Sequence, residues 1–513
     1  MKKTQTHPWV LNRDAVDRVA QAIIFLFMLM AIAACTAKAD DSPPAIRAIQ
    51  KTPIAAELAA AFYARPEVTN GVGQGIRSME PRLTGTALAQ NPLIVRGQYL
   101  ARAGDCSSCH TRPDGLPFAG GLPLQTPFGT IVSSNITPDK TAGIGNYTLN
   151  NFDQALRHGL GKDSSNLYPA MPYANYARLS DEDLAALFTF FMQAVPPATQ
   201  ENVKTNLSWP FSMRWLMKGW NWLYLPTKPY VPDTAQTAEW NRGAYLVQGL
   251  GHCGACHTPR GIAGAEKAST EKVGSAFLSG ALIDGWYAQP LRASNSDDNK
   301  PKAGLASWSP TDIAEFLKTG RSQHTAAFGP MTDVVSNSTQ HMTAEDLAAM
   351  ARYLKSVGTD SRFANNVVAG SIARTGDVMQ YDPATTALRA GDVSARGAMI
   401  YVNNCSACHR SDGQGAARTF PTMARSTAVA AEDATSLIRI VLQGSAMPYT
   451  EQAPSELAMP GFDWRLSDDN VADVLSFVRA SWGNQDASVT PASVAKVRGE
   501  IQKSISPVPK KAP

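Results

Sequence analysis

The motif Cys-x-x-Cys-His occurs three times in this chain of 513 residues. Its copies are Cys106-Ser-Ser-Cys109-His110, Cys253-Gly-Ala-Cys256-His257 and Cys405-Ser-Ala-Cys408-His409. The spacing suits attachment of haem c, because two thiols must reach the two vinyl groups of one porphyrin while the next imidazole turns onto its iron. A zinc site would need its cysteine pairs close in sequence, and these pairs lie far apart. The chain is therefore predicted to hold three covalently bound haem c groups.

The start of the chain is typical of an export signal. Basic residues precede an apolar run from Ala22 to Ala34, and the run ends at Cys35, the one cysteine of seven outside the haem motifs. Residues 1–35 are predicted to be a signal peptide of the lipoprotein type, with lipidation of Cys35, because Ile32-Ala33-Ala34-Cys35 resembles a bacterial lipobox. Ala37-Lys38-Ala39 is a competing site of ordinary cleavage.

Composition narrows the function only slightly. The 47 basic and 43 acidic residues give a net charge of +4, which favours neither nucleic acid nor an acidic partner. No segment after the signal approaches the ~20 apolar residues that a membrane span requires. The mature protein is therefore predicted to be soluble in itself or held at a membrane surface.

Three equivalent helical segments accompany each haem motif, so the chain contains an internal repeat. An opening helix with a glycine precedes the motif, and that glycine would let another helix approach closely. A middle helix ends at a glycine, and a closing helix begins with a Ser or Thr cap. The opening segments are 96–100, 242–246 and 396–400, the middle helices end at Gly159, Gly320 and Gly444, and the closing helices start near Leu184, Leu347 and Val471.

The caps of the closing helices differ slightly in sequence. The first two fit a Ser/Thr-x-x-Asp capping box, in which cap and acid bond each other's backbone, and Asn470 makes the third a looser match. We therefore expect the full box in the first two closing helices.

These elements predict an all-α fold of three tandem cytochrome c domains, each wrapped around one haem. The predicted divisions are a signal peptide at 1–35, an extension or linker at 36–93, domain 1 at 94–200, an aromatic-rich linker at 201–236, domain 2 at 237–360, a linker at 361–388, domain 3 at 389–484 and a C-terminal tail at 485–513. The extension and the tail are interpreted as linkers or partner-binding arms, and their composition favours solvated disorder.

The sixth iron ligand is assigned from the repeat. A methionine beside a proline follows each middle-helix glycine, and these methionines are Met171, Met331 and Met459. A soft thioether on a stiff loop suits a haem iron. Met447 is the alternative in the third module, but it follows Gly444 too closely to leave room for a comparable loop. Because His/Met ligation leaves no open iron position, the irons are expected to pass electrons, and no catalytic residue is predicted.

Several short runs carry a resemblance to a known family. They are residues 126–131, 135–138, 168–173, 284–288, 459–462 and 481–484. These runs resemble the triheme cytochrome c subunit of bacterial membrane-bound, quinone-linked dehydrogenases of the alcohol, gluconate and aldehyde dehydrogenase type. The resemblance extends from about Arg96 to Asn484. It implies that the six motif thiols, the three motif histidines and the three chosen methionines occupy haem-binding positions.

The same resemblance implies partners and a location. We expect a large dehydrogenase subunit with pyrroloquinoline quinone, a flavin or a molybdenum cofactor, and transfer of electrons from it to membrane ubiquinone. Substrate oxidation would take place on that partner, at the periplasmic face of the bacterial inner membrane. The alternative is a freestanding periplasmic multihaem carrier between soluble donors and an oxidase. A haem enzyme with a substrate of its own would need a five-coordinate iron.

One aromatic cluster leaves two interpretations open. Trp209, Trp215, Trp220, Trp222 and Tyr224 lie between the first and second modules, with basic residues among them. Tryptophan beside basic residues suits a membrane interface or a quinone pocket. Packing between two haem domains is the simpler interpretation and is favoured here.

Overall fold

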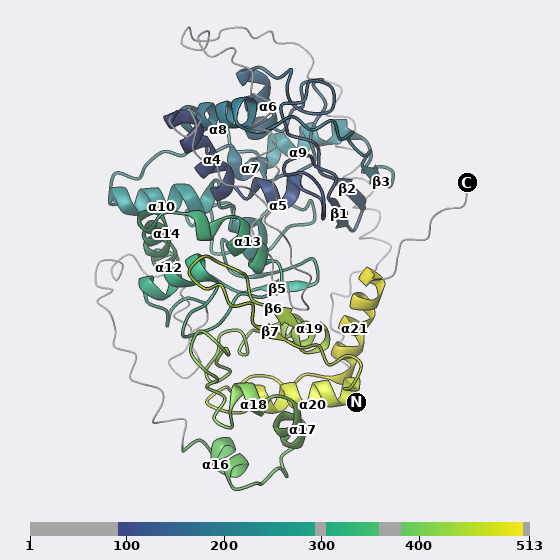
Figure 1. Cartoon of the computed structure of the whole chain (residues 1–513), viewed down its shortest axis with the longest axis vertical. Helices are drawn as coiled ribbons and strands as arrows, with labels where there is room; N and C mark the ends of the chain where they lie inside the picture. The colour runs from purple at the N-terminus through teal and green to yellow at the C-terminus, as the bar shows by residue number, and fades with distance from the viewer. Residues whose placement is uncertain (1–90, 293–303, 359–380, 506–513) are drawn as a thin grey trace, which may run out of the picture. The chain divides into compact units, whose positions relative to one another are not determined.

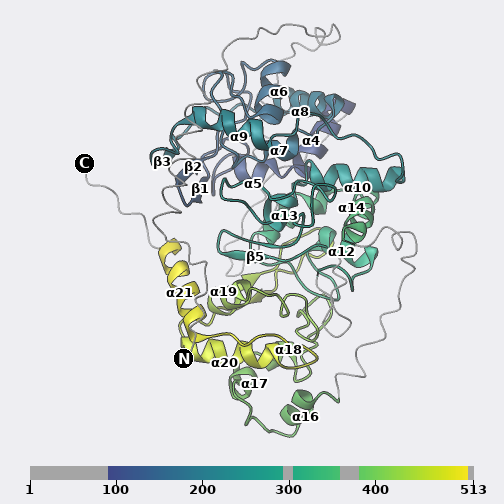
Figure 2. The same cartoon turned by 180° about the vertical axis from the view of Figure 1, so that it is seen from behind.

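The computed structural model describes residues 91–292, 304–358 and 381–505 (Figures 1 and 2). The chain divides into two compact units, Met1–Lys51 and Thr52–Pro513, and every described residue belongs to the second. The predicted signal peptide with Cys35, nearly all of the extension at 36–93 and most of the linker at 361–388 lie outside the described residues. The described part is mainly helical with a few short strands, so the prediction of an all-α fold omitted the small hairpins.

The first module contains α4 (Pro92–Ala103), α5 (Cys106–His110), α6 (Leu149–His158), α7 (Tyr173–Tyr176) and α8 (Asp181–Gln193). Its opening helix α4 packs along its closing helix α8. Gly97 makes this approach possible, because a Cβ at that position would lie 2.1 Å from the carbonyl oxygen of Ala186. The antiparallel strands β1 (Pro123–Thr126), β2 (Gly129–Val132) and β3 (Asn206–Leu207) form a small sheet beside these helices.

The second module repeats this order. It contains α10 (Ala238–Gln248), α11 (Gly254–His257), α12 (Pro310–Thr319), α13 (Met331–Asn337) and α14 (Ala344–Ser356), with a 3-10 turn η3 at Thr339–His341. Here α10 packs on α14, and a Cβ at Gly243 would lie 2.0 Å from the carbonyl oxygen of Ala349. Strands β4 (Ala281–Ile283) and β5 (Trp286–Ala288) form an antiparallel hairpin.

The third module has the same helix order with a different ending. A short helix, α16 (Pro383–Arg389), precedes α17 (Ala398–Asn404), α18 (Ser406–His409), α19 (Thr435–Gln443) and α20 (Asp468–Arg479). A Cβ at Gly397 would lie 2.2 Å from the carbonyl oxygen of Asp473, so the opening glycine has the same role in all three modules. Strands β6 (Ser445–Ala446) and β7 (Ala458–Met459) pair antiparallel.

The predicted ends of the middle helices are confirmed. Helices α6, α12 and α19 end at Gly159, Gly320 and Gly444, whose φ angles of 63°, 70° and 77° lie in the left-handed region. Glycine adopts this conformation without the Cβ clash that other residues would meet.

The prediction of a linker or arm after residue 485 is wrong for residues 491–505. These residues form α21 (Pro491–Ile505), which packs on α19 and α20. Val494, Val497 and Ile501 are buried, and Arg498 donates to Asp468 at 2.8 Å. The buried positions recur at three- and four-residue steps, a helical period that composition alone concealed.

The aromatic-rich linker contains short regular elements. Residues 201–236 contain β3, a 3-10 turn η2 (Arg214–Leu216) and α9 (Met217–Tyr224). Helix α9 lies beside α7 of the first module in both views (Figures 1 and 2).

The first two modules share one hydrophobic core, whereas the third has its own. A single cluster of buried side chains runs from Ile94 in α4 to Val357 after α14. A second cluster runs from Ala398 in α17 to Ile501 in α21. Among the described residues, no helix is long and apolar enough to cross a membrane.

The full capping box was expected in the first two closing helices, α8 and α14, but it is complete only in the third, α20. The reciprocal box is complete in α20, where Ser467 and Asn470 each bond the other's backbone nitrogen. In α8 and α14 the caps accept from the backbone nitrogens of Asp183 and Asp346 at 3.2 Å, but these two carboxylates turn to other partners.

The carboxylates of Asp183 and Asp346 each accept a hydrogen bond from a tyrosine of the other module, so they join the first two modules reciprocally. The hydroxyl of Tyr245 in the second module donates to Asp183 in the first at 2.6 Å. The hydroxyl of Tyr99 in the first module donates to Asp346 in the second at 2.5 Å. Each carboxylate also accepts from the opening-helix arginine of its own module, at 2.6 Å from Arg96 and 2.7 Å from Arg242. We call this arrangement the tyrosine lock.

Candidate haem sites

Each Cys-x-x-Cys-His motif forms one short helical turn. The turns are α5, α11 and α18, and each directly follows the opening helix of its module. Helical spacing places the first and second cysteines, three residues apart, on one face, with the histidine next to the second. This order of donors is the one that attachment of haem c requires.

The motif histidines have the same hydrogen-bond partner in all three modules, a backbone carbonyl from the following loop. The Nδ1 atoms of His110, His257 and His409 lie 2.7, 2.7 and 2.9 Å from the carbonyl oxygens of Ser134, Gln289 and Pro421. A carbonyl oxygen only accepts, so Nδ1 must carry the proton and Nε2 keeps its lone pair. Haem-ligating histidines use this orientation, because the second bond fixes the ring.

The electrostatics of the motifs agree with neutral ligands. Burial lowers the pKa of His110, His257 and His409, so these imidazoles stay neutral at pH 7. Burial raises the pKa of Cys253 to about 12 and that of Cys405 to about 11. The thiols of Cys253 and Cys405 therefore stay protonated at neutral pH, which does not favour a reactive dithiol.

The loops after the first two motifs are built alike. The hydroxyl of Thr111, the residue after His110, accepts from the backbone nitrogen of Phe118 at 3.1 Å. The hydroxyl of Thr258, the residue after His257, accepts from that of Leu278 at 3.0 Å. Arg410 replaces the threonine in the third module and has a φ of 62°. The first two sites are thus closer to each other in construction than to the third.

The first two motifs also meet across the module boundary. The side-chain amide of Asn337 in the second module donates to Ser108 in the first motif at 2.9 Å. Burial, then the charges of Asp105 and of Cys256 in the second motif, raise the pKa of Cys109 to about 12. The first motif turn is therefore bonded to the second module, and Cys109 lies close enough to Cys256 to be affected by its charge.

The predicted methionine ligands lie at two kinds of position. Met171 and Met331 are half-buried and pack against the shared core. Met171 precedes the short helix α7, and Met331 is the first residue of α13. Met459 lies on β7, paired with Ser445, and Met447 is buried on the same hairpin, its backbone nitrogen 2.9 Å from the oxygen of Leu457. Sequence offsets suggested three comparable loops, and the third differs because a β-hairpin replaces the irregular segment. Met459 as the ligand, with Met447 as the alternative, stays a prediction.

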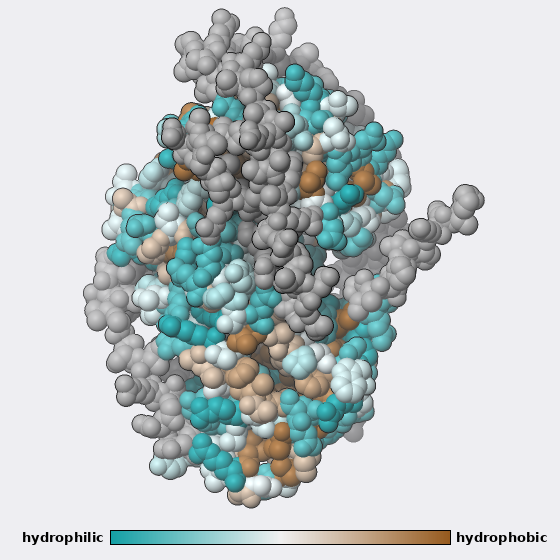
Figure 3. All heavy atoms as spheres, in the orientation of Figure 1, coloured by the Kyte–Doolittle hydropathy of each residue, from teal (hydrophilic) through white to brown (hydrophobic). Residues whose placement is uncertain are grey.

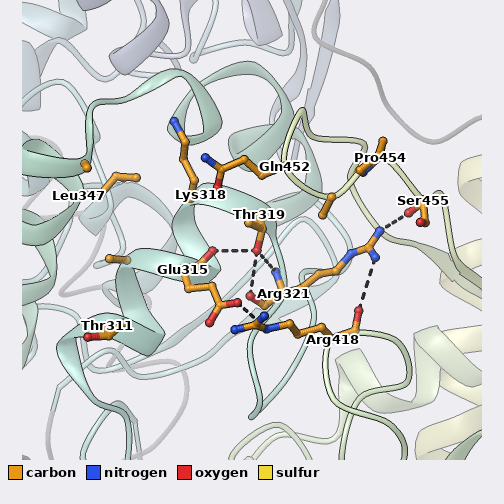
Figure 4. Close-up of a pocket in the computed structure, with 13 residues that line it drawn as sticks. Thr311, Glu315, Lys318, Thr319, Arg321, Leu347, Arg418, Gln452, Pro454 and Ser455 are labelled. Carbon is orange, nitrogen blue, oxygen red and sulfur yellow. Dashed lines mark hydrogen bonds and ion pairs between the residues drawn. The ribbon is translucent and has the colours of Figure 1, made fainter.

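A cavity of about 640 Å³ lies apart from the predicted haem ligands. It is bounded by α12 and by loop residues of the third module, and Figure 4 shows Arg321 reaching across it. The Arg321 guanidinium donates to the carbonyl oxygens of Ser455 and Arg418, and Arg418 pairs with Glu315 at 2.7 Å. These bonds join the second module to the third.

Sequence reasoning missed the carbonyls that orient the histidines and the tyrosine lock. Backbone carbonyls carry no residue identity, so no motif marks them. The lock had a visible signal, because Arg-Gly-x-Tyr recurs at 96–99 and 242–245 together with an acid at the third position of each closing helix.

The repeated donor turn on a helical module is that of a c-type cytochrome. A model of the cytochrome c family, described as "Cytochrome c", matches residues 394–482 in the third module.

Comparison with known proteins gives the family of the whole chain. The chain is 48% identical to the gluconate 2-dehydrogenase cytochrome c subunit of Pantoea cypripedii over 415 residues, which span 80% of this chain and 90% of that protein. It is 46% identical over 426 residues to the cytochrome c subunit of the quinone alcohol dehydrogenase of Gluconacetobacter polyoxogenes. This match spans 81% of this chain and 87% of that protein. It is 37% identical over 438 residues to the fructose dehydrogenase cytochrome subunit of Gluconobacter japonicus. This match spans 83% of this chain and 86% of that protein. The chain belongs to the family of dehydrogenase cytochrome c subunits, which confirms the predicted resemblance.

Proposed function

We propose that this chain carries electrons through three covalently bound haem c groups, from a partner dehydrogenase subunit to membrane ubiquinone or the respiratory chain. The observation that carries the proposal is the threefold recurrence of one donor turn, each with its histidine Nδ1 held by a backbone carbonyl. Bound haem c supplies a one-electron iron couple. The residues of this chain hold and orient that group, and substrate oxidation belongs to the partner.

The proposal assigns one cytochrome c domain to each module. Cys106, Cys109 and His110 bind the first haem, Cys253, Cys256 and His257 the second, and Cys405, Cys408 and His409 the third. Met171, Met331 and Met459 complete the iron coordination. The similar order of helices and the common role of the opening glycine support three domains of one kind.

The number of haems is tested by removing one attachment cysteine at a time. The wild-type chain is expected to contain three haems, and Cys106→Ser, Cys253→Ser and Cys405→Ser two each, by intact mass and the pyridine haemochrome assay. A wild-type count below three would refute the assignment of three sites.

The axial ligands are tested by methionine replacement. Met171→Ala, Met331→Ala and Met459→Ala should each open one iron, so that carbon monoxide shifts the reduced spectrum of one haem. Met399→Ala is the control, because that side chain is 51% exposed. A shift in Met447→Ala, and none in Met459→Ala, would transfer the third ligand to Met447. A shift in the wild-type chain would instead support a five-coordinate haem enzyme.

The partner and the electron acceptor are tested on the native complex. The relatives are subunits of gluconate, alcohol and fructose dehydrogenases, so membership of the family does not fix the substrate of the partner. Purification through a C-terminal tag in mild detergent is expected to recover a stoichiometric large subunit with pyrroloquinoline quinone, a flavin or a molybdenum cofactor. That complex should reduce ubiquinone analogues. Recovery of the triheme chain alone would favour a freestanding carrier between soluble donors and an oxidase.

The proposed location is the periplasmic face of the inner membrane, after export by residues 1–35. Mass spectrometry of the mature N-terminus tests it: a diacylated Cys35 establishes the lipoprotein, and a start at residue 40 establishes ordinary cleavage after Ala39.

A further inference from the structure

The aromatic segment, defined here as residues 208–225, is fixed to the protein along one side. The indole nitrogen of Trp220 donates to the carbonyl oxygen of Ala263 at 3.0 Å, and its ring lies 5.7 Å from that of Tyr173. Asn221 accepts from the Tyr173 hydroxyl at 2.8 Å, and Arg214 donates to the carbonyl oxygen of Asn166 at 2.9 Å. The expected packing role is therefore correct for this side of the segment only.

The segment also carries large exposed apolar side chains. Trp215 is 48% exposed, Trp222 81% and Leu223 51%, and Trp209 at the start of the segment is 76% exposed. Trp215 and Trp222 are seven residues apart, two turns of one helical face. A Cβ at Gly219, between them, would meet nothing within 4 Å, so this face points away from the protein. Large rings gathered in this way on a surface mark an interaction site.

The charged side chains of residues 202–232 are all basic. No Asp or Glu occurs between Glu201 and Asp233, whereas Lys204, Lys218 and Lys228 are exposed there. Protein interfaces are enriched in tryptophan but depleted of lysine, so the exposed lysines distinguish this surface from a protein interface. Tryptophan, tyrosine and lysine on one surface suit the headgroup region of a bilayer with anionic lipids, where rings enter the acyl boundary and ammonium groups meet phosphates.

We propose that the aromatic segment is a membrane-contact surface that inserts Trp209, Trp215 and Trp222 into the headgroup region of an anionic bilayer. This contact does not depend on the proposed electron-transfer function. It is also separate from lipidation of Cys35, which would attach the chain through its N-terminus. The loop that carries Met171 adjoins the segment through Tyr173, so the first haem-binding site lies next to this surface.

The location of the contact is tested with vesicles that contain a photoactivatable phosphatidylcholine and about 30% phosphatidylglycerol, an anionic lipid. The purified holoprotein, with any co-purifying subunit, is irradiated and its tryptic peptides are analysed by mass spectrometry. Label is expected in the peptides that cover residues 205–242. Label confined to the N-terminus, or its absence from 205–242 while other described peptides are labelled, would overturn the proposal.

Substitutions test the contributions of rings and charge. The triple variant Trp209→Ser, Trp215→Ser, Trp222→Ser should lower vesicle binding at least about tenfold, because three indoles leave the bilayer contact. Lys218→Glu should weaken binding to anionic vesicles at least about fivefold, and binding to neutral vesicles far less. Trp464→Ser is the matched control, since Trp464 is 78% exposed in the third module.

A variant is accepted only if its haem absorption spectrum and haem content equal those of the wild type, so a folding failure is not mistaken for lost binding. Equal binding by the triple variant and Trp464→Ser would overturn the proposal. The same conclusion would follow if the segment were labelled by lipid in the isolated chain and shielded in a purified dehydrogenase complex, because the partner would then cover it.

Discussion

The tyrosine lock predicts a measurable coupling between the first two modules. Tyr99→Phe removes one hydroxyl and keeps the ring. The lost bond, at 2.5 Å to Asp346, ends on a carboxylate that is only 8% exposed. Burial, and then Asp346 itself, raise the pKa of Tyr99 to about 12, so this hydroxyl is a donor throughout the neutral range.

The loss of stability in Tyr99→Phe depends on the hydrogen bonds that Asp346 keeps after the substitution. A hydrogen bond to a charged group contributes about 1.5–3 kcal/mol. Asp346 keeps two bonds from Arg242, each at 2.7 Å, so the carboxylate is not left unsatisfied and the lower value, about 1.5 kcal/mol, applies. Tyr245→Phe should cost a similar amount, because Asp183 keeps its bond to Arg96.

Hydrogen exchange followed by mass spectrometry is the suitable assay, because a chain with several modules does not unfold in one step. Since about 1.4 kcal/mol corresponds to a factor of ten, slow amides of α4, α8, α10 and α14 should exchange about tenfold faster in either variant. Those of α20 should not change. Tyr381→Phe is the control, because Tyr381 is 78% exposed. Unchanged exchange in α4 and α10 in both variants would refute the lock.

Two further predictions concern stability. Gly97→Ala should lower the melting temperature, because its Cβ would lie 2.1 Å from the oxygen of Ala186 and overpacking costs about 1–3 kcal/mol. Gly219→Ala has open space around its Cβ and should instead stabilise α9 by up to about 1 kcal/mol. Equal melting temperatures of the two variants would contradict this contrast. Burial alone would raise the pKa of Asp346, but bonds from Arg242 and the neighbouring tyrosine outweigh it and hold that pKa below its usual range. A carboxylate with a lowered folded pKa stabilises the protein above its unfolded pKa of about 4, and this contribution is lost as pH falls through the folded pKa. Asp346→Asn should therefore weaken the acid dependence of unfolding below about pH 4, and an unchanged acid limb would contradict the assignment.

Local signals allowed much of the fold to be predicted. The three donor turns, the glycine stops at Gly159, Gly320 and Gly444, and the close helix approach at Gly97 each depend on a few adjacent residues. The small hairpins and α21 were missed because their stability comes from tertiary contacts, which intrinsic propensity does not report.

The site was predictable only where side chains define it. The histidine partners are backbone oxygens, which have no sequence signature. The capping box failed as a predictor for Asp183 and Asp346 because a residue from a neighbouring module competes for each carboxylate, and a local motif cannot register that competitor.

The same competition explains why the third module is attached differently. Met399 stands where Tyr99 and Tyr245 stand in the other opening helices, and Asn470 stands where the lock has its acids. The two differences have a common effect. Among the residues that the structure describes, no tyrosine hydroxyl from another opening helix donates to the Asn470 side chain, which instead accepts from the backbone nitrogen of Ser467 and caps its own helix. Met399 and Val402 on α17 are left 51% and 38% exposed, and hydrophobic surface is visible near this lower end in Figure 3.

The third module instead uses its middle helix to meet the second. Ser436 in α19 accepts from the backbone nitrogen of Tyr287 in β5 at 2.7 Å, and Arg439 donates to the carbonyl oxygen of Gly285 at 2.9 Å. These bonds end on backbone atoms of the β4–β5 hairpin, and the Arg439 guanidinium also lies 5.4 Å from the centroid of the Trp286 ring in β5. The third module therefore lacks both residue types of the lock at the equivalent positions, and it joins the second module through α19, a surface that the lock does not use.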